Sequence, residues 1–165
     1  MIRSVFATVA LVAGLAFAGL AFNASPAAAL ELATAEADVQ ALIAQNQTDA
    51  DGLEAAIEDY VTNSEDPEVA AQAVLAVGAG LPDDSPLKIA LGRGLGAAIA
   101  VIGLTDPNLA ATLQALAAAS GDEELVAAVS AGTSDKTASI EQNAGGGTGG
   151  EDPVNETPDE PASAS

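Results

Sequence analysis

The sequence predicts an all-α protein: a small bundle of five or six short helices around a central apolar helix at about residues 86–104, followed by a disordered tail. The central segment is the first reason. Residues 94–104 carry no polar side chain, and a helix that is apolar all round is buried on every side or lies in a membrane. Elsewhere apolar residues recur at helical spacing, and no segment shows the β-branched alternation of a strand.

The first 29 residues have the features of a signal peptide. Arg3 gives a positive start, an apolar run follows over residues 5–22, and residues 27–29 are the small residues that a signal peptidase requires. We therefore expect cleavage after Ala29 and export to the periplasm or the outside of the cell. The apolar run is about as long as a membrane span, so an uncleaved anchor is the alternative.

The charge balance is strongly acidic, with 24 Asp and Glu against 4 Lys and Arg and a formal net charge of −20. Nucleic acid and anionic membrane surfaces both require a basic face, so neither is an expected partner. The chain has no cysteine and no histidine. This excludes a His-based triad, a cysteine nucleophile and a disulfide framework. We predict that the protein is not an enzyme, and we assign no catalytic, cofactor-binding or metal-ligating residue.

Two helices are predicted at the start of the mature chain. Residues 31–47 form the first, with Thr34 as a candidate cap. Its apolar stripe consists of Leu32, Ala35, Val39, Leu42 and Ile43. The second runs from about Asp51 to Thr62, and Asp51 with Glu54 resembles a capping box. Its buried face is predicted to be Leu53, Ile57, Tyr60 and Val61, with Glu54, Glu58 and Asp59 outward.

A third helix begins at Asp66-Pro67, a cap residue followed by proline at the first helical position. Gly78 and Gly80 are expected to end it. Its predicted inner face consists of Val69, Ala73, Ala76 and Val77. Ser85-Pro86 repeats the cap-and-proline start and opens the central helix, whose only charges are Lys88 and Arg93.

Asp106-Pro107 begins a fifth helix, with Leu109, Leu113 and Leu116 on one side. Ser120 followed by Glu123 predicts a shorter sixth helix that carries Leu125 and Val129 and ends at Gly132.

From residue 133 the composition becomes rich in Gly, Pro, Ser, Thr and acidic residues. Such a segment buries too little apolar surface to offset its ordering entropy. The sequence therefore predicts a helical domain at residues 30–132 and a disordered acidic tail at residues 133–165.

An internal echo links two of the predicted helix starts. Residues 66–71 recur forty residues later as residues 106–111, and forty residues is the size of a HEAT-type helix pair. The alternative is that helix starts independently select Asp-Pro. Because fewer than three units are too few for a free-standing solenoid, we expect a compact bundle in either case.

Residues 47–58 resemble an EF-hand calcium loop. Asp49, Asp51, Gly52 and Glu58 fall at the third, fifth, sixth and twelfth positions of that loop. Gln47 departs from the pattern, because the first ligand should be a carboxylate. The competing interpretation is that the two aspartates cap the second helix.

The glycines of the central helix allow a close approach of another backbone. Residues 92–97 match a GxGxxA string, but a dinucleotide fingerprint requires a preceding strand, so we set that function aside. Gly92, Gly96 and Ala100 are four residues apart and form a smooth stripe. Because the uninterrupted apolar part is too short to span a bilayer, we expect this stripe to pack inside the bundle.

These observations predict an exported, non-enzymatic, acidic helical protein with a structural or protein-interaction role. Its partner is an unidentified protein or a second copy of the chain, and a membrane partner is not expected after signal cleavage. One alternative is a membrane-associated or pore-forming protein that uses residues 87–104. A minor alternative is calcium binding through residues 47–58.

Overall fold

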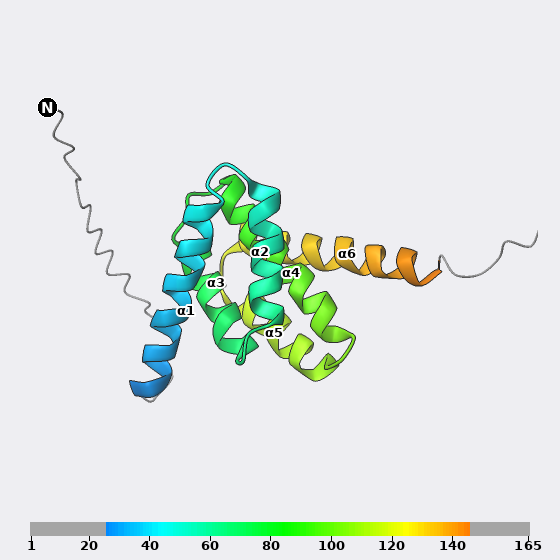
Figure 1. Cartoon of the computed structure of the whole chain (residues 1–165), viewed down its shortest axis with the longest axis horizontal. Coiled ribbons are helices and arrows are strands. Elements are labelled where there is room, and N and C mark those ends of the chain that lie inside the picture. Colours follow the sequence, from blue (N-terminus) through cyan, green and yellow to red (C-terminus); the bar gives the residue numbers. More distant parts are fainter. Residues whose placement is uncertain (1–25, 146–165) are drawn as a thin grey trace, which may run out of the picture.

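The computed structural model describes residues 26–145, and these residues form six helices and no strand (Figure 1). The helices are α1 (Pro26–Gln45), α2 (Ala50–Thr62), α3 (Pro67–Ala79), α4 (Pro86–Gly103), α5 (Pro107–Ala119) and α6 (Glu123–Gly145). The predicted all-α class and the central apolar helix are confirmed. The expected signal segment over residues 1–25 and the tail over residues 146–165 lie outside the described residues.

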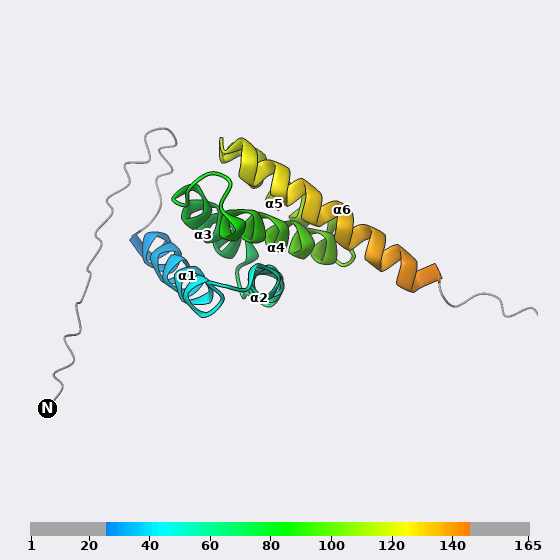
Figure 2. The same cartoon turned by 90° about the horizontal axis from the view of Figure 1, so that it is seen from above.

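The helices are arranged as three consecutive pairs that stack on one another (Figure 2). In one row α3 contacts both α1 and α5, and in the other α4 contacts both α2 and α6. The two similar sequence segments occupy equivalent positions in this arrangement, because they form the starts of α3 and α5, forty residues apart. The first unit is α1 with α2, the second is α3 with α4, and the third is α5 with α6; the sequence echo covers only the starts of α3 and α5.

Helix α4 is the hub of the domain and contacts α2, α3, α5 and α6. Most of its length is buried, as an apolar helix without a polar face requires. Its most extensive contact is with α6, and the next is with α2. These two helices therefore enclose α4 from either side.

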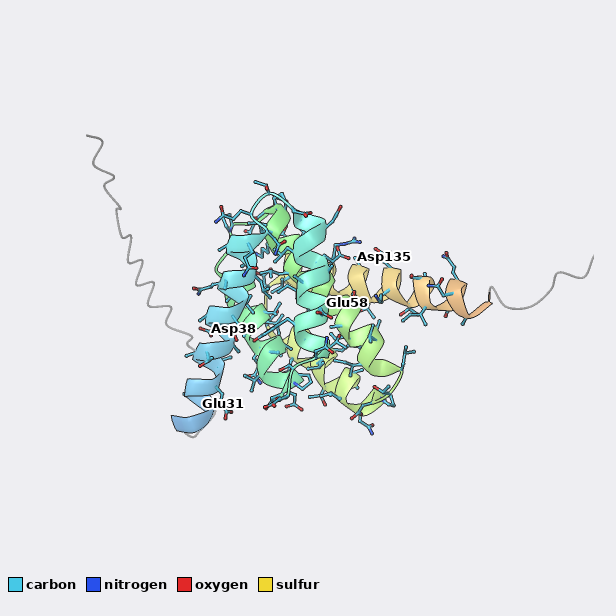
Figure 3. The ribbon with its side chains drawn as sticks, in the orientation of Figure 1. Glu31, Asp38, Glu58 and Asp135 are labelled. Carbon is cyan, nitrogen blue, oxygen red and sulfur yellow. The ribbon has the colours of Figure 1, made fainter. Side chains whose placement is uncertain are left out.

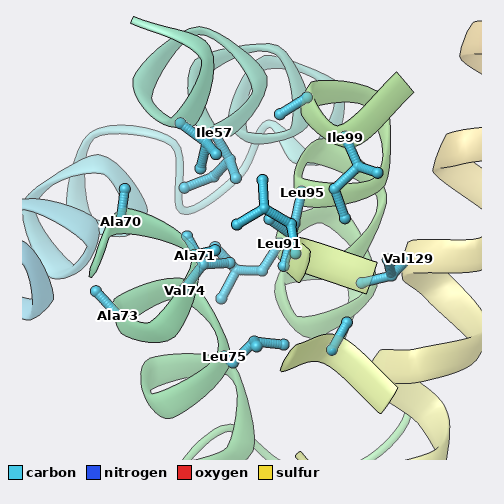
Figure 4. Close-up of a cluster of buried hydrophobic side chains, with 14 of the residues drawn as sticks. Ile57, Ala70, Ala71, Ala73, Val74, Leu75, Leu91, Leu95, Ile99 and Val129 are labelled. Atoms are coloured by element: carbon cyan, nitrogen blue, oxygen red, sulfur yellow. The ribbon is translucent and has the colours of Figure 1, made fainter. Parts of the chain in front are cut away.

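The core consists of Ala, Leu, Val and Ile contributed by all six helices (Figure 4). Its largest fully buried apolar side chains are Leu53, Ile57, Leu91, Leu95, Ile99, Leu113 and Leu125. The predicted stripes on α1 and α2 are confirmed, although Tyr60 is only half buried. On α3 the buried face differs from the prediction and consists of Ala70, Ala71, Ala73, Val74, Leu75 and Gly78. Two neighbours, α1 and α4, cover that helix, so its buried arc is wider than one stripe.

Aspartate side chains cap α2, α3 and α5 with nearly the same backbone angles. Asp66 and Asp106 each accept hydrogen bonds from the two backbone N–H groups that follow the proline, as predicted. The predicted cap at Asp51 is wrong, because Asp49 accepts from the Gly52 N–H at 2.9 Å and Asp51 lies inside the helix. The predicted N-cap at Thr34 is also wrong, because Thr34 lies inside α1, which begins eight residues earlier at Pro26, within the predicted signal segment.

The sixth helix is longer than the sequence predicted. It continues through Gly132 to Gly145, so the expected end at Gly132 and the expected lack of structure over residues 133–145 are both wrong. Gly132 is buried against the backbone of Arg93, where a side chain would not fit. This glycine is therefore required by close helix packing and does not act as a helix stop.

Candidate functional site

The contact between α4 and α6 is made by two backbones in close approach. A Cβ atom on Gly92 would meet the side chain of Ala128, and one on Gly96 would meet the backbone carbonyl of Val129. A Cβ on Gly132 of α6 would meet the backbone of Arg93 in return. The predicted packing role of Gly92 and Gly96 is thus confirmed, and the helical conformation here rules out the strand that a dinucleotide fingerprint needs.

The close approach lets a side chain of one helix reach the backbone of the other. The Thr133 hydroxyl lies 3.0 Å from the Gly96 carbonyl and 2.9 Å from the carbonyl of Val129, the residue one turn earlier in its own helix. A bulkier residue than glycine at position 96 would separate these groups. The hydrogen bond therefore depends on the glycine contact.

A buried lysine joins α4 to the start of α6. Lys88 is 1% exposed, and its ammonium lies 2.7 Å from both Asp83 and Asp122 and 3.5 Å from Glu124. Hydrogen bonds to Asp122 and Asp83 raise the pKa of Lys88 above its ordinary value, although burial acts in the opposite direction. Lys88 is therefore charged, and its charge is satisfied by carboxylates from outside its own helix.

Asp122 combines two roles at this point. It accepts a hydrogen bond from the Leu125 N–H at 3.0 Å, which caps α6, and it pairs with Lys88. Burial alone would raise the pKa of Asp122, but hydrogen bonds from Lys88 and the backbone, with the lysine charge, lower it below its ordinary value. The predicted capping role of Ser120 belongs to this aspartate instead.

Two further cations, Arg93 and Lys136, link α6 to α2. Figure 3 labels two of the acids involved, Glu58 on α2 and Asp135 on α6. Arg93 lies 2.7 Å from Glu54 of α2 and 2.9 Å from Asp135 of α6, and Lys136 pairs with Glu58 of α2. The expectation that Glu54 and Glu58 face only solvent is therefore wrong. The pKa of Arg93 is raised above its ordinary value, chiefly by its hydrogen bond to Glu54.

The acidic residues around Lys88 line a wide, shallow hollow between the α3–α4 turn and the start of α6. It is lined by Ala79, Asp83, Asp84, Ser120, Gly121, Asp122, Glu123 and Glu124. Asp84 has a positive φ of 58°, and its N–H donates to the Glu124 carboxylate at 2.9 Å. Lys88 occupies the inner side of this cluster. Within residues 26–145 no group of His, Cys, Asp and Glu has an arrangement that would hold a metal ion.

The stretch that resembles a calcium loop does not form a loop. Residues 50–58 lie in α2, so all but the first three of its twelve positions are helical. Asp49 is engaged as the cap of that helix, and Glu58 pairs with Lys136. The capping interpretation is therefore the correct one for Asp49.

The remaining carboxylates stand on the outer surface. Figure 3 shows Glu31 and Asp38 projecting from α1 into solvent. Within the described residues, all three basic side chains are already paired with acids of the same molecule. The surface therefore keeps an excess of negative charge without a local counter-charge.

Among the described residues, α4 is the one helix long and apolar enough to cross a membrane, and 61% of that window is buried inside the protein. A core helix of a water-soluble domain has the same properties. No family model, curated protein or solved structure matches this chain.

Sequence reasoning found Lys88 and Arg93 but not their partners. The missed residues are Asp83, Asp122 and Glu124 around Lys88, Asp135 beside Arg93, and Lys136 beside Glu58. Asp135 and Lys136 lie in the segment expected to be disordered. A sequence signal for them was present: Asp135 and Lys136 follow Gly132 at helical spacing and continue the stripe that begins at Leu125 and Val129.

Proposed function

We propose that this chain is an exported, non-enzymatic helical protein that binds a basic partner protein through its acidic surface. The observation that carries the proposal is the internal use of every described cation. Lys88, Arg93 and Lys136 each pair within the molecule, so the exposed carboxylates are left to an external partner. The signal-like first 29 residues support a site of action in the periplasm or outside the cell.

The first unit, α1 with α2, is the part of this surface where negative charge is least balanced by positive charge. Residues 26–62 carry eight acidic side chains, at positions 31, 36, 38, 49, 51, 54, 58 and 59, and no basic one. Those at positions 31, 38, 49, 51 and 59 are exposed. A complementary basic surface would be attracted at a distance and would neutralise these charges on contact.

A membrane-associated role for residues 87–104 would require α4 to leave its contacts inside the domain. The apolar side chains of α4 are packed against α2 and α6, and Lys88 and Arg93 are held by carboxylates of the domain. Insertion into lipid would separate these contacts before any apolar surface became available. This requirement favours the partner-binding role.

Affinity capture from the envelope fraction of the producing cells tests the proposal. We expect the chain to retain a protein with a basic surface, and to release it as salt screens the contact. Changing Glu31→Gln, Asp38→Asn and Asp59→Asn together should abolish the capture. The matched control, Gln40→Ala with Gln45→Ala on the same exposed surface of α1, should leave it intact.

Two results would contradict the proposal. One is a partner whose retention is unchanged by salt and by the neutralising substitutions. The other is recovery of the chain only in the cytoplasm with residues 1–29 still attached, because export is part of the proposal. Mass measurement of the recovered chain, with an expected N-terminus at Leu30, decides the second point.

A further inference from the structure

The contact between α4 and α6 changes in character along its length. Near the start of both helices it consists of charged groups, where the Lys88 ammonium meets Asp122 and Glu124. Residues 125–134 of α6 carry no charge, and there the contact is made by glycines and by the Thr133 hydroxyl. Only the first of these two regions responds directly to the protonation of carboxylates.

Lys88 is the one cation among the described residues that water cannot reach. Its side chain is 1% exposed, whereas the side chains of Arg93 and Lys136 are 34% and 31% exposed. When their carboxylate partners are protonated, Arg93 and Lys136 can be hydrated in place. Lys88 keeps its proton in acid, and a buried charge without a counter-charge is strongly destabilising. The protein therefore accommodates the loss of these carboxylate charges by exposing Lys88 to water.

The carboxylates around Lys88 also hold the α3–α4 turn against the start of α6. Glu124 accepts a hydrogen bond from the Asp84 N–H at 2.9 Å. Asp83 of the turn and Asp122, which caps α6, each lie 2.7 Å from the Lys88 ammonium. A carboxylate that loses its charge is a weaker acceptor, so protonation weakens the hydrogen bonds together with the ion pairs. We call Lys88, Asp83, Asp84, Asp122 and Glu124 the Lys88 cluster.

Leu125 connects this cluster to the apolar core. It follows Glu124 directly, and its N–H donates to the Asp122 carboxylate at 3.0 Å. Its side chain is fully buried against Gly78 of α3 and Gly92 of α4. A movement of the start of α6 away from the turn would draw Leu125 out of this position.

We propose that the Lys88 cluster is an acid-sensitive latch between the α3–α4 turn and the start of α6. In acid the protonated carboxylates release the turn, Lys88 becomes hydrated and Leu125 leaves the core, while the glycine contact further along keeps α6 attached to α4. The lowered pKa of Asp122 agrees with this, because that carboxylate stays ionised until the pH falls below the ordinary aspartate value. The latch is a property of the fold, so it does not depend on the proposed binding of a basic partner.

Acid acts in the opposite direction elsewhere in the domain. The other charged side chains on the helices that pack against α4 are Asp51, Glu54, Glu58 and Asp59 on α2, Glu68 on α3, and Glu123, Asp135, Lys136 and Glu141 on α6, and α5 has none. The first unit carries no cation of its own, so protonation there relieves repulsion between carboxylates. A selective loss of order at the Lys88 cluster is therefore distinguishable from general unfolding in acid.

Backbone amide exchange of the full chain, followed by NMR and corrected for the intrinsic effect of pH on exchange, tests the latch. Between about pH 7 and about pH 3, we expect protection at residues 125–128 to fall about tenfold or more relative to protection at residues 129–133. The amide proton signals of Asp84 and Leu125 should move over the same pH range, because both N–H groups donate to carboxylates of the cluster. Protection that is unchanged, or that falls uniformly along α6, would overturn the proposal.

Two lysine variants separate the latch from a general effect of acid. Lys88→Met removes the buried charge and keeps a side chain of similar length, so acid should then raise protection at residues 125–128 by relieving repulsion among the remaining carboxylates. Lys136→Met removes a cation that is 31% exposed, and it should keep the acid response of the wild type. Circular dichroism melts at neutral pH show whether each variant is folded. An acid response of Lys88→Met equal to that of the wild type contradicts the latch, and the wild-type measurement decides alone if that variant does not fold.

Discussion

The helices on either side of α4 contact it in opposite ways. On the α2 side the space is filled by side chains, chiefly Leu53, Ile57 and Val61, which are fully buried. On the α6 side the side chains are removed, because Gly92, Gly96 and Gly132 bring the two backbones together. The α2 contact is therefore stabilised chiefly by apolar area, and the α6 contact chiefly by the close packing of two backbones, with Leu125 and Val129 adding apolar area at one end.

This difference determines which substitutions each side tolerates. A filled contact loses stability when a side chain is shortened, since a cavity remains. A backbone contact loses stability when a side chain is added, since neither backbone can move without the rest of its helix. Gly94 adds a small element of the second kind to the α2 side, where a Cβ would meet the backbone of Glu54.

Ile57→Ala gives the largest effect expected. Shortening this fully buried side chain should lower the free energy of unfolding by about 3 kcal/mol, through lost apolar burial and an unfilled cavity. Chemical denaturation measures this loss. Ile89→Ala is the control, because Ile89 is 39% exposed, and it should cost less than about 1 kcal/mol. Equal losses would show that α2 does not cover α4 as described.

Gly96→Ala tests the other side with the opposite change in volume. The added methyl group meets the Val129 carbonyl, so overpacking near the upper end of about 1–3 kcal/mol exceeds the helix-propensity gain of about 1 kcal/mol. A net loss of about 2 kcal/mol is expected in the same denaturation assay.

Gly103→Ala is the matched control for that substitution. It lies at the end of the same helix, and its nearest neighbour would be the Ala110 Cβ at 3.6 Å, an ordinary contact. Stability should be unchanged or slightly higher. A neutral Gly96→Ala would mean that α4 and α6 can separate at little cost, and the distinction between the two sides would then fail.

The contrast between the two sides also explains what the sequence could and could not predict. Filled contacts leave a periodic apolar signal, so the faces of α1 and α2 were identified from spacing alone. Glycine carries no such signal, because the same residue also ends helices. Gly92 and Gly96 lie within a long apolar run, which predicts packing residues, whereas Gly132 is followed by polar residues, which predict a helix stop.

That single interpretation led to the missed contacts of α6. With the helix ended at Gly132, Asp135 and Lys136 fell into the expected tail, and the partners of Arg93 and Glu58 were not available to sequence reasoning. Ion pairs between distant segments depend on the three-dimensional arrangement of the helices, so they follow only once the helix pairs are stacked. The sequence shows that Lys88 and Arg93 place two charges in an apolar helix, but it does not show which carboxylates pair with them.

Asp122→Asn should give the smallest effect and the most specific one. Asparagine still caps α6, but it removes the negative charge that pairs with Lys88. At neutral pH we expect the melting temperature to fall by a few degrees. Asp106→Asn, which makes the same change at the cap of α5 away from the buried lysine, should alter it less.

The pH dependence gives the sharper test. Because the pKa of Asp122 is lowered in the folded protein, its contribution is present above the ordinary aspartate pKa of about 3.9 and is lost as the pH falls through the folded value. The difference in melting temperature between wild type and Asp122→Asn should therefore shrink below about pH 4. A difference that stays constant down to pH 2 would show that the lysine contact does not hold α6. The α6 side of α4 would then depend on the close backbone contact, the Thr133 hydrogen bond and the Arg93–Asp135 pair.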